Sequence, residues 1–195
     1  MTRNKGPCLE FVPPQTFRQL APLKFPLLKG LIGNKEALCF WKKPFSFSNF
    51  SDAPIKIYRE WYQSTEHWYQ SSKAQYFGDE ELKKKILAED QPIIIKKLGR
   101  NNNVKGFDLL VWRTKSFERG LVAKFVQHEM LKKMLLGTGE AILIESSPFD
   151  LYWGSGWRME EWAEGCTNDR ANWNGENKMG ECLMVVRDLI KKNFN

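Results

Sequence analysis

The pattern of apolar and polar positions predicts a chain that is mainly helical. In several stretches apolar residues return every three or four positions, which places them on one face of a helix. Helices are expected over Thr65–Phe77, from a cap at Asp79 to Ala88, and over Pro92–Gly99, Phe107–His128, Met130–Leu136 and Asn177–Lys192. The inward positions are Leu110, Phe117, Leu121 and Phe125 in the longest helix and Met179, Leu183, Val186 and Ile190 in the last.

Three short segments favour strands. Ala37–Trp41 is apolar, Pro54–Tyr58 alternates, and Ala141–Ile144 is an apolar run too short for a helix. No internal repeat is visible. The expected fold class is therefore α+β, a mainly helical single domain with a small β-sheet.

Residues 1–35 are predicted to form a proline-rich extension before the domain at 36–195. Five of the nine prolines fall in this stretch, and this density opposes regular helix and strand. Its apolar residues are expected to lie against the domain from Phe17 onward, because disordered tails are usually less apolar.

Charge and composition limit the classes of partner that the chain is expected to bind. The 195 residues carry a formal net charge of +7, which favours a phosphate-bearing partner, including DNA or RNA. The four cysteines are scattered without a CxxC pair, so no structural metal site is predicted. No cofactor is expected either. Without a visible signal peptide or membrane span, we expect an intracellular protein of the cytoplasm or nucleus, and a monomer.

The helix after Trp61 is the first candidate site. Glu66, Gln70 and Lys73 follow at i, i+4 and i+7 and share one face, with Tyr69 beside them. An ordinary surface ion pair is the commoner meaning of Glu and Lys on a helix. The aromatic residues around them favour a cleft wall instead.

The second candidate is the segment Phe149–Gly156. Asp150 is followed there by Trp153, which offers a face for stacking, and by Gly154, which lets the backbone approach a ligand closely. It opens a tryptophan-rich stretch, Ser146–Glu176, that has no clear period. By spacing alone, a packed turn with a core tryptophan is the favoured interpretation.

Seven short motifs together resemble the NADAR family, whose name refers to NAD and ADP-ribose. They occur in the family's order and extend roughly from Cys39 to Lys192. The motifs are FSNF (Phe47–Phe50), TEHWYQSSK (Thr65–Lys73), LGR (Leu98–Arg100), AKFVQH (Ala123–His128), LLGTG (Leu135–Gly139), SPFDLYWGSG (Ser147–Gly156) and GENKMGECLMVVR (Gly175–Arg187).

The chain also departs from the family pattern. Tyr62 and Gln63 stand where the family usually has Trp-Pro, while Leu109 and Arg113 stand at a usual Trp and Lys. The loop from Trp157 to Trp173 is longer than in compact members. These departures bear on the choice of substrate more than on the type of reaction.

The resemblance implies a hydrolase that cuts a ribose C1–N bond. Some members remove ADP-ribose from guanine bases, and the charge and the long loop favour this reading, with the guanine free or in nucleic acid. Others hydrolyse phosphoribosylamino-pyrimidine intermediates of riboflavin biosynthesis. A non-catalytic ADP-ribose-binding module is the third reading, which the presence of both Glu66 and Asp150 disfavours.

The resemblance also implies roles for residues. Glu66 and Asp150 match the family's two acidic positions and are expected to be the catalytic carboxylates. Lys73 is expected either to capture the C1 aldehyde as a Schiff base or to bind a phosphate. Expected substrate-binding residues are Asn49 and Asn177 (ribose), Arg100 (phosphate), Trp153 (stacking), Tyr69, Gln70 and Gly154. Glu145 is expected to be structural, and His67 to be packed and hydrogen-bonded.

Overall fold

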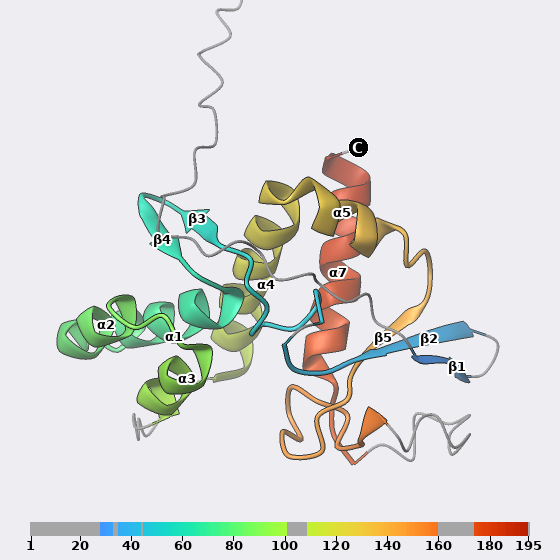
Figure 1. Cartoon of the computed structure of the whole chain (residues 1–195), viewed down its shortest axis with the longest axis horizontal. Coiled ribbons are helices and arrows are strands. Elements are labelled where there is room, and N and C mark those ends of the chain that lie inside the picture. The colour runs from blue at the N-terminus through green and yellow to red at the C-terminus, as the bar shows by residue number, and fades with distance from the viewer. Residues whose placement is uncertain (1–27, 33–34, 44, 101–108, 160–173, 195) are drawn as a thin grey trace, which may run out of the picture.

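A small mixed sheet and a group of helices build the fold. The computed structural model describes residues 28–32, 35–43, 45–100, 109–159 and 174–194. Figure 1 shows helices α1 to α3 on one side, the strands β1, β2 and β5 on the other, and helices α4 and α7 between them. The expected α+β class is confirmed.

The main sheet has the order β1–β2–β5. β1 (Leu28–Ile32) pairs antiparallel with β2 (Lys35–Phe40), and β2 pairs parallel with β5 (Ile142–Glu145). In this register Phe40 lies opposite Glu145, so both strands end at the same edge. The chain between β2 and β5 carries the helices that build one wall of the site.

β1 was not predicted, and the sheet begins before the boundary drawn after residue 35. The five prolines end at Pro26, so the strand itself contains none. β1 is held as a strand by its hydrogen bonds to β2, and no local sequence pattern predicts that pairing. The expected packing from Phe17 up to residue 27 lies outside the described residues.

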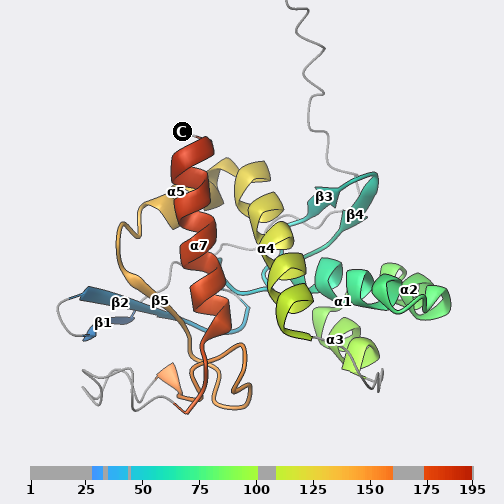
Figure 2. The same cartoon turned by 180° about the vertical axis from the view of Figure 1, so that it is seen from behind.

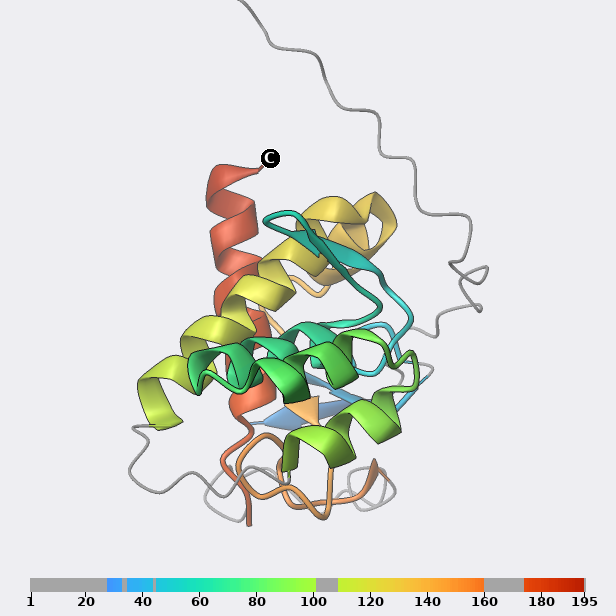
Figure 3. The same ribbon diagram turned by 90° about the vertical axis from the view of Figure 1, so that its left-hand side faces the viewer.

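The first three helices follow the sequence prediction closely. They are α1 (Thr65–Tyr76), α2 (Glu80–Leu87) and α3 (Pro92–Arg100). The Ser64 and Asp79 side chains cap α1 and α2 by accepting hydrogen bonds from the backbone N–H groups of His67 and Leu82. Figure 3 shows α1, α2 and α3 as a layer in front of the sheet.

The main core lies between the sheet, α4 (Leu109–Gln127) and α7 (Lys178–Asn193), with α5 (Glu129–Leu136) closing one end (Figure 2). The predicted inward residues of α7 and three of the four in α4 are buried; the Leu110 side chain is not described. The fully buried members are Phe117, Leu121, Phe125, Met179, Leu183, Val186 and Ile190.

A second, two-stranded sheet covers one flank of α4. β3 (Ile55–Ile57) pairs antiparallel with β4 (Glu60–Tyr62), and β4 was not predicted because three residues are too few to show a period. The Gln127 side chain ties this hairpin to α4 through both backbone groups of Lys56. Among the described residues, no helix combines the length and apolar character that crossing a membrane requires.

Candidate active site

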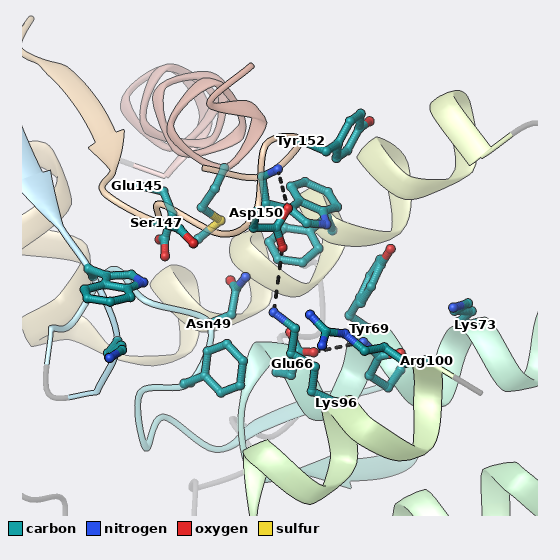
Figure 4. Close-up of a pocket in the computed structure, with 17 residues that line it drawn as sticks. Asn49, Glu66, Tyr69, Lys73, Lys96, Arg100, Glu145, Ser147, Asp150 and Tyr152 are labelled. Carbon is teal, nitrogen blue, oxygen red and sulfur yellow. Dashed lines mark hydrogen bonds and ion pairs between the residues drawn. The ribbon is translucent and has the colours of Figure 1, made fainter. Parts of the chain in front are cut away.

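A cavity of about 340 Å³ opens where α1, α3 and the loop after β5 meet. Figure 4 shows its polar side chains converging from these elements. The lining residues are Trp41, Lys42, Asn49, Phe50, Glu66, Tyr69, Gln70, Lys73, Lys96, Arg100, Phe117, Glu145, Ser147, Asp150, Tyr152, Trp153 and Met179.

Helix α1 forms one wall and is buried along its first two turns. The Glu66 carboxylate is 4% exposed and accepts a hydrogen bond of 2.8 Å from Gln70 Nε2. Burial raises the pKa of Glu66, and the Lys96 ammonium opposes this rise. A surface ion pair is therefore ruled out, because the face with Glu66 and Gln70 points into the molecule.

Helix α3 supplies two of the cations of the site, Lys96 and Arg100. Its Gly99 lies directly against the Gln70 side chain, and a Cβ at this position would overlap it. The same close approach lets Lys73 Nζ donate a hydrogen bond of 2.9 Å to the Gly99 carbonyl. Lys96 and Arg100 then reach the cavity from α3.

The end of β5 and the loop after it supply two further carboxylates, Glu145 and Asp150. Asp150 Oδ1 accepts a hydrogen bond of 3.0 Å from the Trp153 N–H, and Asp150 Oδ2 lies 3.7 Å from Lys96 Nζ. Burial raises the pKa of Glu145 to about 8, helped by the negative charges of Asp150 and Glu66 and opposed by Lys96 and Lys124. Glu145 is therefore largely protonated at neutral pH.

The segment Phe47–Ser51 contributes Asn49 and Phe50 to the cavity wall, and a buried lysine holds it in place. The fully buried Lys124 Nζ donates to the Ser48 carbonyl (2.9 Å) and to Ser51 Oγ (2.6 Å). Desolvation lowers the pKa of Lys124 to about 7. The Asn49 carbonyl accepts from the Glu66 N–H at 3.2 Å, while Asn49 Oδ1 is buried without a partner in the described structure. Such an orphaned acceptor is suited to a substrate hydroxyl.

Most residues expected at the site line the cavity. They are Asn49, Glu66, Tyr69, Gln70, Lys73, Arg100, Asp150 and Trp153. The Trp153 ring differs from expectation in one respect, because Phe117 stacks on it at 4.3 Å between centroids and Tyr69 meets it edge-on. One face of Trp153 is thus already occupied by protein.

Asn177 and Gly154 do not line the cavity. The Asn177 carboxamide accepts from the Glu145 N–H and donates to the Leu143 carbonyl, both at 2.9 Å, so it fixes α7 to β5 instead of binding ribose. A Cβ at Gly154 would meet Ser147 Cβ at 2.6 Å and the Asp150 carbonyl at 2.8 Å. Gly154 therefore allows the tight loop that presents Asp150, and its contribution is indirect.

Glu145, Lys96 and Ser147 line the cavity but were not assigned to it. Glu145 was expected to be structural, and the structure corrects this. It ends a strand that runs parallel to its neighbour, and ligands gather at the carboxyl ends of parallel strands. The sequence alone could not place Glu145 at the site, because it does not show that β2 and β5 pair. In the described part of the chain, no cluster of His, Cys, Asp and Glu suits a metal ion.

Comparisons with known proteins identify a family and several relatives that are similar to this chain. Residues 38–191 match the family model of the NADAR domain. The chain is 32% identical over 147 residues to N-glycosidase YbiA of Shigella flexneri serotype 5b, covering 74% of this chain and 80% of that protein. It is 31% identical over 154 residues to N-glycosidase Npun_R5314 of Nostoc punctiforme, covering 77% and 88%.

The fold is similar to a solved structure as well. The NMR structure of the Escherichia coli protein YbiA superposes with a TM-score of 0.64 at 26% identity, covering 80% of this chain and 84% of that chain. The family match over residues 38–191 includes every residue that lines the cavity. The chain belongs to the NADAR family.

Proposed function

We propose that the chain is an N-glycosidase that hydrolyses a ribose C1–N bond. The observation that carries the proposal is the gathering of Glu66, Glu145 and Asp150 around one cavity. Breaking this bond builds positive charge on the sugar and negative charge on the departing nitrogen, so it needs a carboxylate and an acid. The relatives that are named N-glycosidases support the same reaction class.

The environments of the three carboxyl groups suggest separate roles. Glu145 keeps its proton at neutral pH and donates it to the leaving nitrogen. Asp150, fixed by the Trp153 N–H and facing Lys96, stabilises the positive charge that develops at C1. Glu66 has a raised pKa, which makes its ionised form a stronger base, and it takes a proton from the attacking water.

The arrangement of charges supports ADP-ribose on a guanine base as the substrate. Lys73 and Arg100 lie on the side of the cavity away from Glu145 and Ser147 (Figure 4). Two cations at one side suit the two phosphates of ADP-ribose. The leaving base then lies at the side of Glu145, next to its proton donor. A phosphoribosylamino-pyrimidine carries a single phosphate and so places less negative charge beside these two cations.

One pair of incubations tests the function. The protein is mixed with ADP-ribosylated guanosine or with a phosphoribosylamino-pyrimidine, and chromatography follows free ADP-ribose, ribose phosphate and base. We expect release of ADP-ribose from guanosine at the higher kcat/KM. Preference for the pyrimidine would reverse the assignment of substrate. Binding of ADP-ribose with no cleavage of either compound would identify a binding module instead.

The rate is expected to fall as pH rises through about 8. Glu145 supplies its proton only while protonated, and its pKa is raised from 4.5 to about 8, so the active form is lost above that pH. The measurement is kcat against pH from 6 to 10. In Glu145→Gln, which cannot donate this proton, kcat is expected to be low and the fall near pH 8 absent. An unchanged alkaline limb in that variant would remove Glu145 from the role of acid.

Lys73→Met is expected to lower kcat/KM by about tenfold or more, because both roles considered for Lys73 depend on the amine that the substitution removes. Adding borohydride during turnover separates the roles. Capture of the C1 aldehyde leaves a reduced adduct on Lys73 that mass spectrometry detects, whereas phosphate binding leaves none. Full activity of Lys73→Met would exclude both roles. Lys133→Met, on the exposed face of α5, is the matched control.

A further inference from the structure

An exposed aromatic ring stands immediately before the catalytic loop aspartate. Phe149 is 81% exposed, more than any other large apolar side chain among the described residues. Its ring centroid lies 6.5 Å from that of Trp41, with the ring planes 47° apart. Because its ring is so exposed, Phe149 keeps a face available on which an aromatic ligand can stack.

Trp41 connects this ring with the cavity. It lines the cavity and directly follows β2, whose last residue Phe40 lies opposite Glu145. The Phe40 carbonyl accepts a hydrogen bond of 2.9 Å from the Ser146 N–H, which holds the two strand ends together. Trp41 and Phe149 therefore continue the Glu145 side of the cavity outward, away from Lys73 and Arg100.

A cation accompanies the two rings. Lys42 Nζ lies 3.7 Å from the centroid of the Trp41 ring, and Lys42 is exposed. Its φ of 60° is a left-handed conformation that side chains other than glycine rarely adopt, and it turns the chain sharply at this point. The neighbouring Lys43 forms an ion pair with Asp52, with 2.6 Å between its Nζ and the Asp52 Oδ1. Of these two lysines, Lys42 is therefore the one that places its positive charge beside the aromatic rings.

We propose that Trp41, Lys42 and Phe149 form a subsite for the nucleotide next to the modified base in a single-stranded polynucleotide. This inference rests on the proposed function, because it places the leaving base at the Glu145 side of the cavity. The adjacent base stacks on Phe149, and the connecting phosphate meets the Lys42 ammonium. Aromatic platforms beside cations bind single strands in this way, and the net charge of +7 suits the polyanion.

The geometry selects a single strand over a duplex or a free nucleoside. In a duplex the neighbouring base is paired and stacked, so placing it on Phe149 costs the energy of unpairing and unstacking it, whereas a single strand avoids most of this cost. A modified mononucleoside has no neighbouring base at all. The subsite thus predicts a higher kcat/KM on a modified single strand than on a modified duplex or a modified mononucleoside, a preference that the cavity alone does not provide.

The test compares ADP-ribosylated guanosine with a single-stranded 9-mer oligodeoxynucleotide that contains one such base. Wild type is expected to show the higher kcat/KM on the 9-mer, and Phe149→Ala to lower it about tenfold, mainly through KM. On the mononucleoside Phe149→Ala should match wild type. Met130→Ala removes another strongly exposed apolar side chain (70%) from α5 and should change the cleavage of neither substrate.

Two results would overturn the subsite and leave the glycosidase standing. They are equal kcat/KM of wild type on both substrates, and unchanged cleavage of the 9-mer by Phe149→Ala. If wild type cleaves neither substrate, the proposed function has failed, and fluorescence anisotropy with an unmodified labelled 9-mer decides the subsite alone. Weaker binding by Phe149→Ala than by Met130→Ala supports it, and equal binding refutes it.

Discussion

Glu66→Gln is expected to lower kcat by about 10²- to 10⁴-fold while the protein stays folded, the range that a positioned acid or base contributes. Glutamine has nearly the shape of glutamate, and its Oε1 can still accept the hydrogen bond that Gln70 Nε2 donates. What is lost is the negative charge and, with it, the ability to take up a proton. Released ADP-ribose is measured at saturating substrate, with circular dichroism as the check on folding.

The control for this variant is Glu60→Gln, which removes an equal charge from the exposed first residue of β4. It should retain full activity. If Glu66→Gln were as active as Glu60→Gln, the assignment of Glu66 as the base would be wrong.

The stability of Glu66→Gln is expected to exceed that of wild type above pH 5. Burial raises the pKa of Glu66 above its unfolded value of 4.5, so the folded state favours the protonated form. The free energy of unfolding of wild type therefore falls as pH rises through the window between the two pKa values, whereas the neutral glutamine contributes no such loss. The difference in Tm between the two proteins should widen as pH rises above 4.5.

Gly180→Ala is expected to destabilise the fold by about 3 kcal/mol and to abolish most activity, at the upper end of the cost of overpacking. A Cβ at Gly180 would overlap the Leu143 carbonyl of β5, which is backbone and cannot turn aside, and would press on the Asn177 carboxamide. Asn177 bonds the Glu145 N–H and the Leu143 carbonyl, so separating α7 from β5 displaces Glu145.

Urea unfolding gives the free-energy difference, and kcat/KM measured well below the unfolding midpoint gives the effect on the site. Gly137→Ala is the matched control, because Gly137 has an ordinary φ of −64° at the end of α5. A Gly180→Ala protein as stable and active as Gly137→Ala would show that α7 does not set the position of β5.

The local physics of the chain determined the helices without help from the rest of the molecule. The period of apolar residues in α4 and α7, the Asp79 cap of α2 and the proline at the start of α3 are all properties of a few neighbouring residues. The same holds for the face of α1 that presents Glu66 and Gln70, since helix geometry alone brings i and i+4 together.

The motif order added what local physics lacked, namely that the distant Asp150 and Asn49 belong with Glu66. It did not separate residues that line the cavity from residues that support it. Asn177 and Gly154 lie within motifs as Asp150 does, yet they hold the loop and strand in place. A motif records that a residue type is needed and does not say which way its side chain points.

Only the tertiary structure decided β1, the place of Glu145 in the cavity wall and the contacts of the buried Lys124 amine with the segment around Asn49. Each depends on a partner far along the chain: β1 on β2, Glu145 on the parallel pairing of β5 with β2, and Lys124 on Ser48 and Ser51. A helix satisfies its hydrogen bonds within a few residues, so its sequence is enough to predict it. A strand, a buried charge and a cavity obtain their partners only when the whole chain has folded.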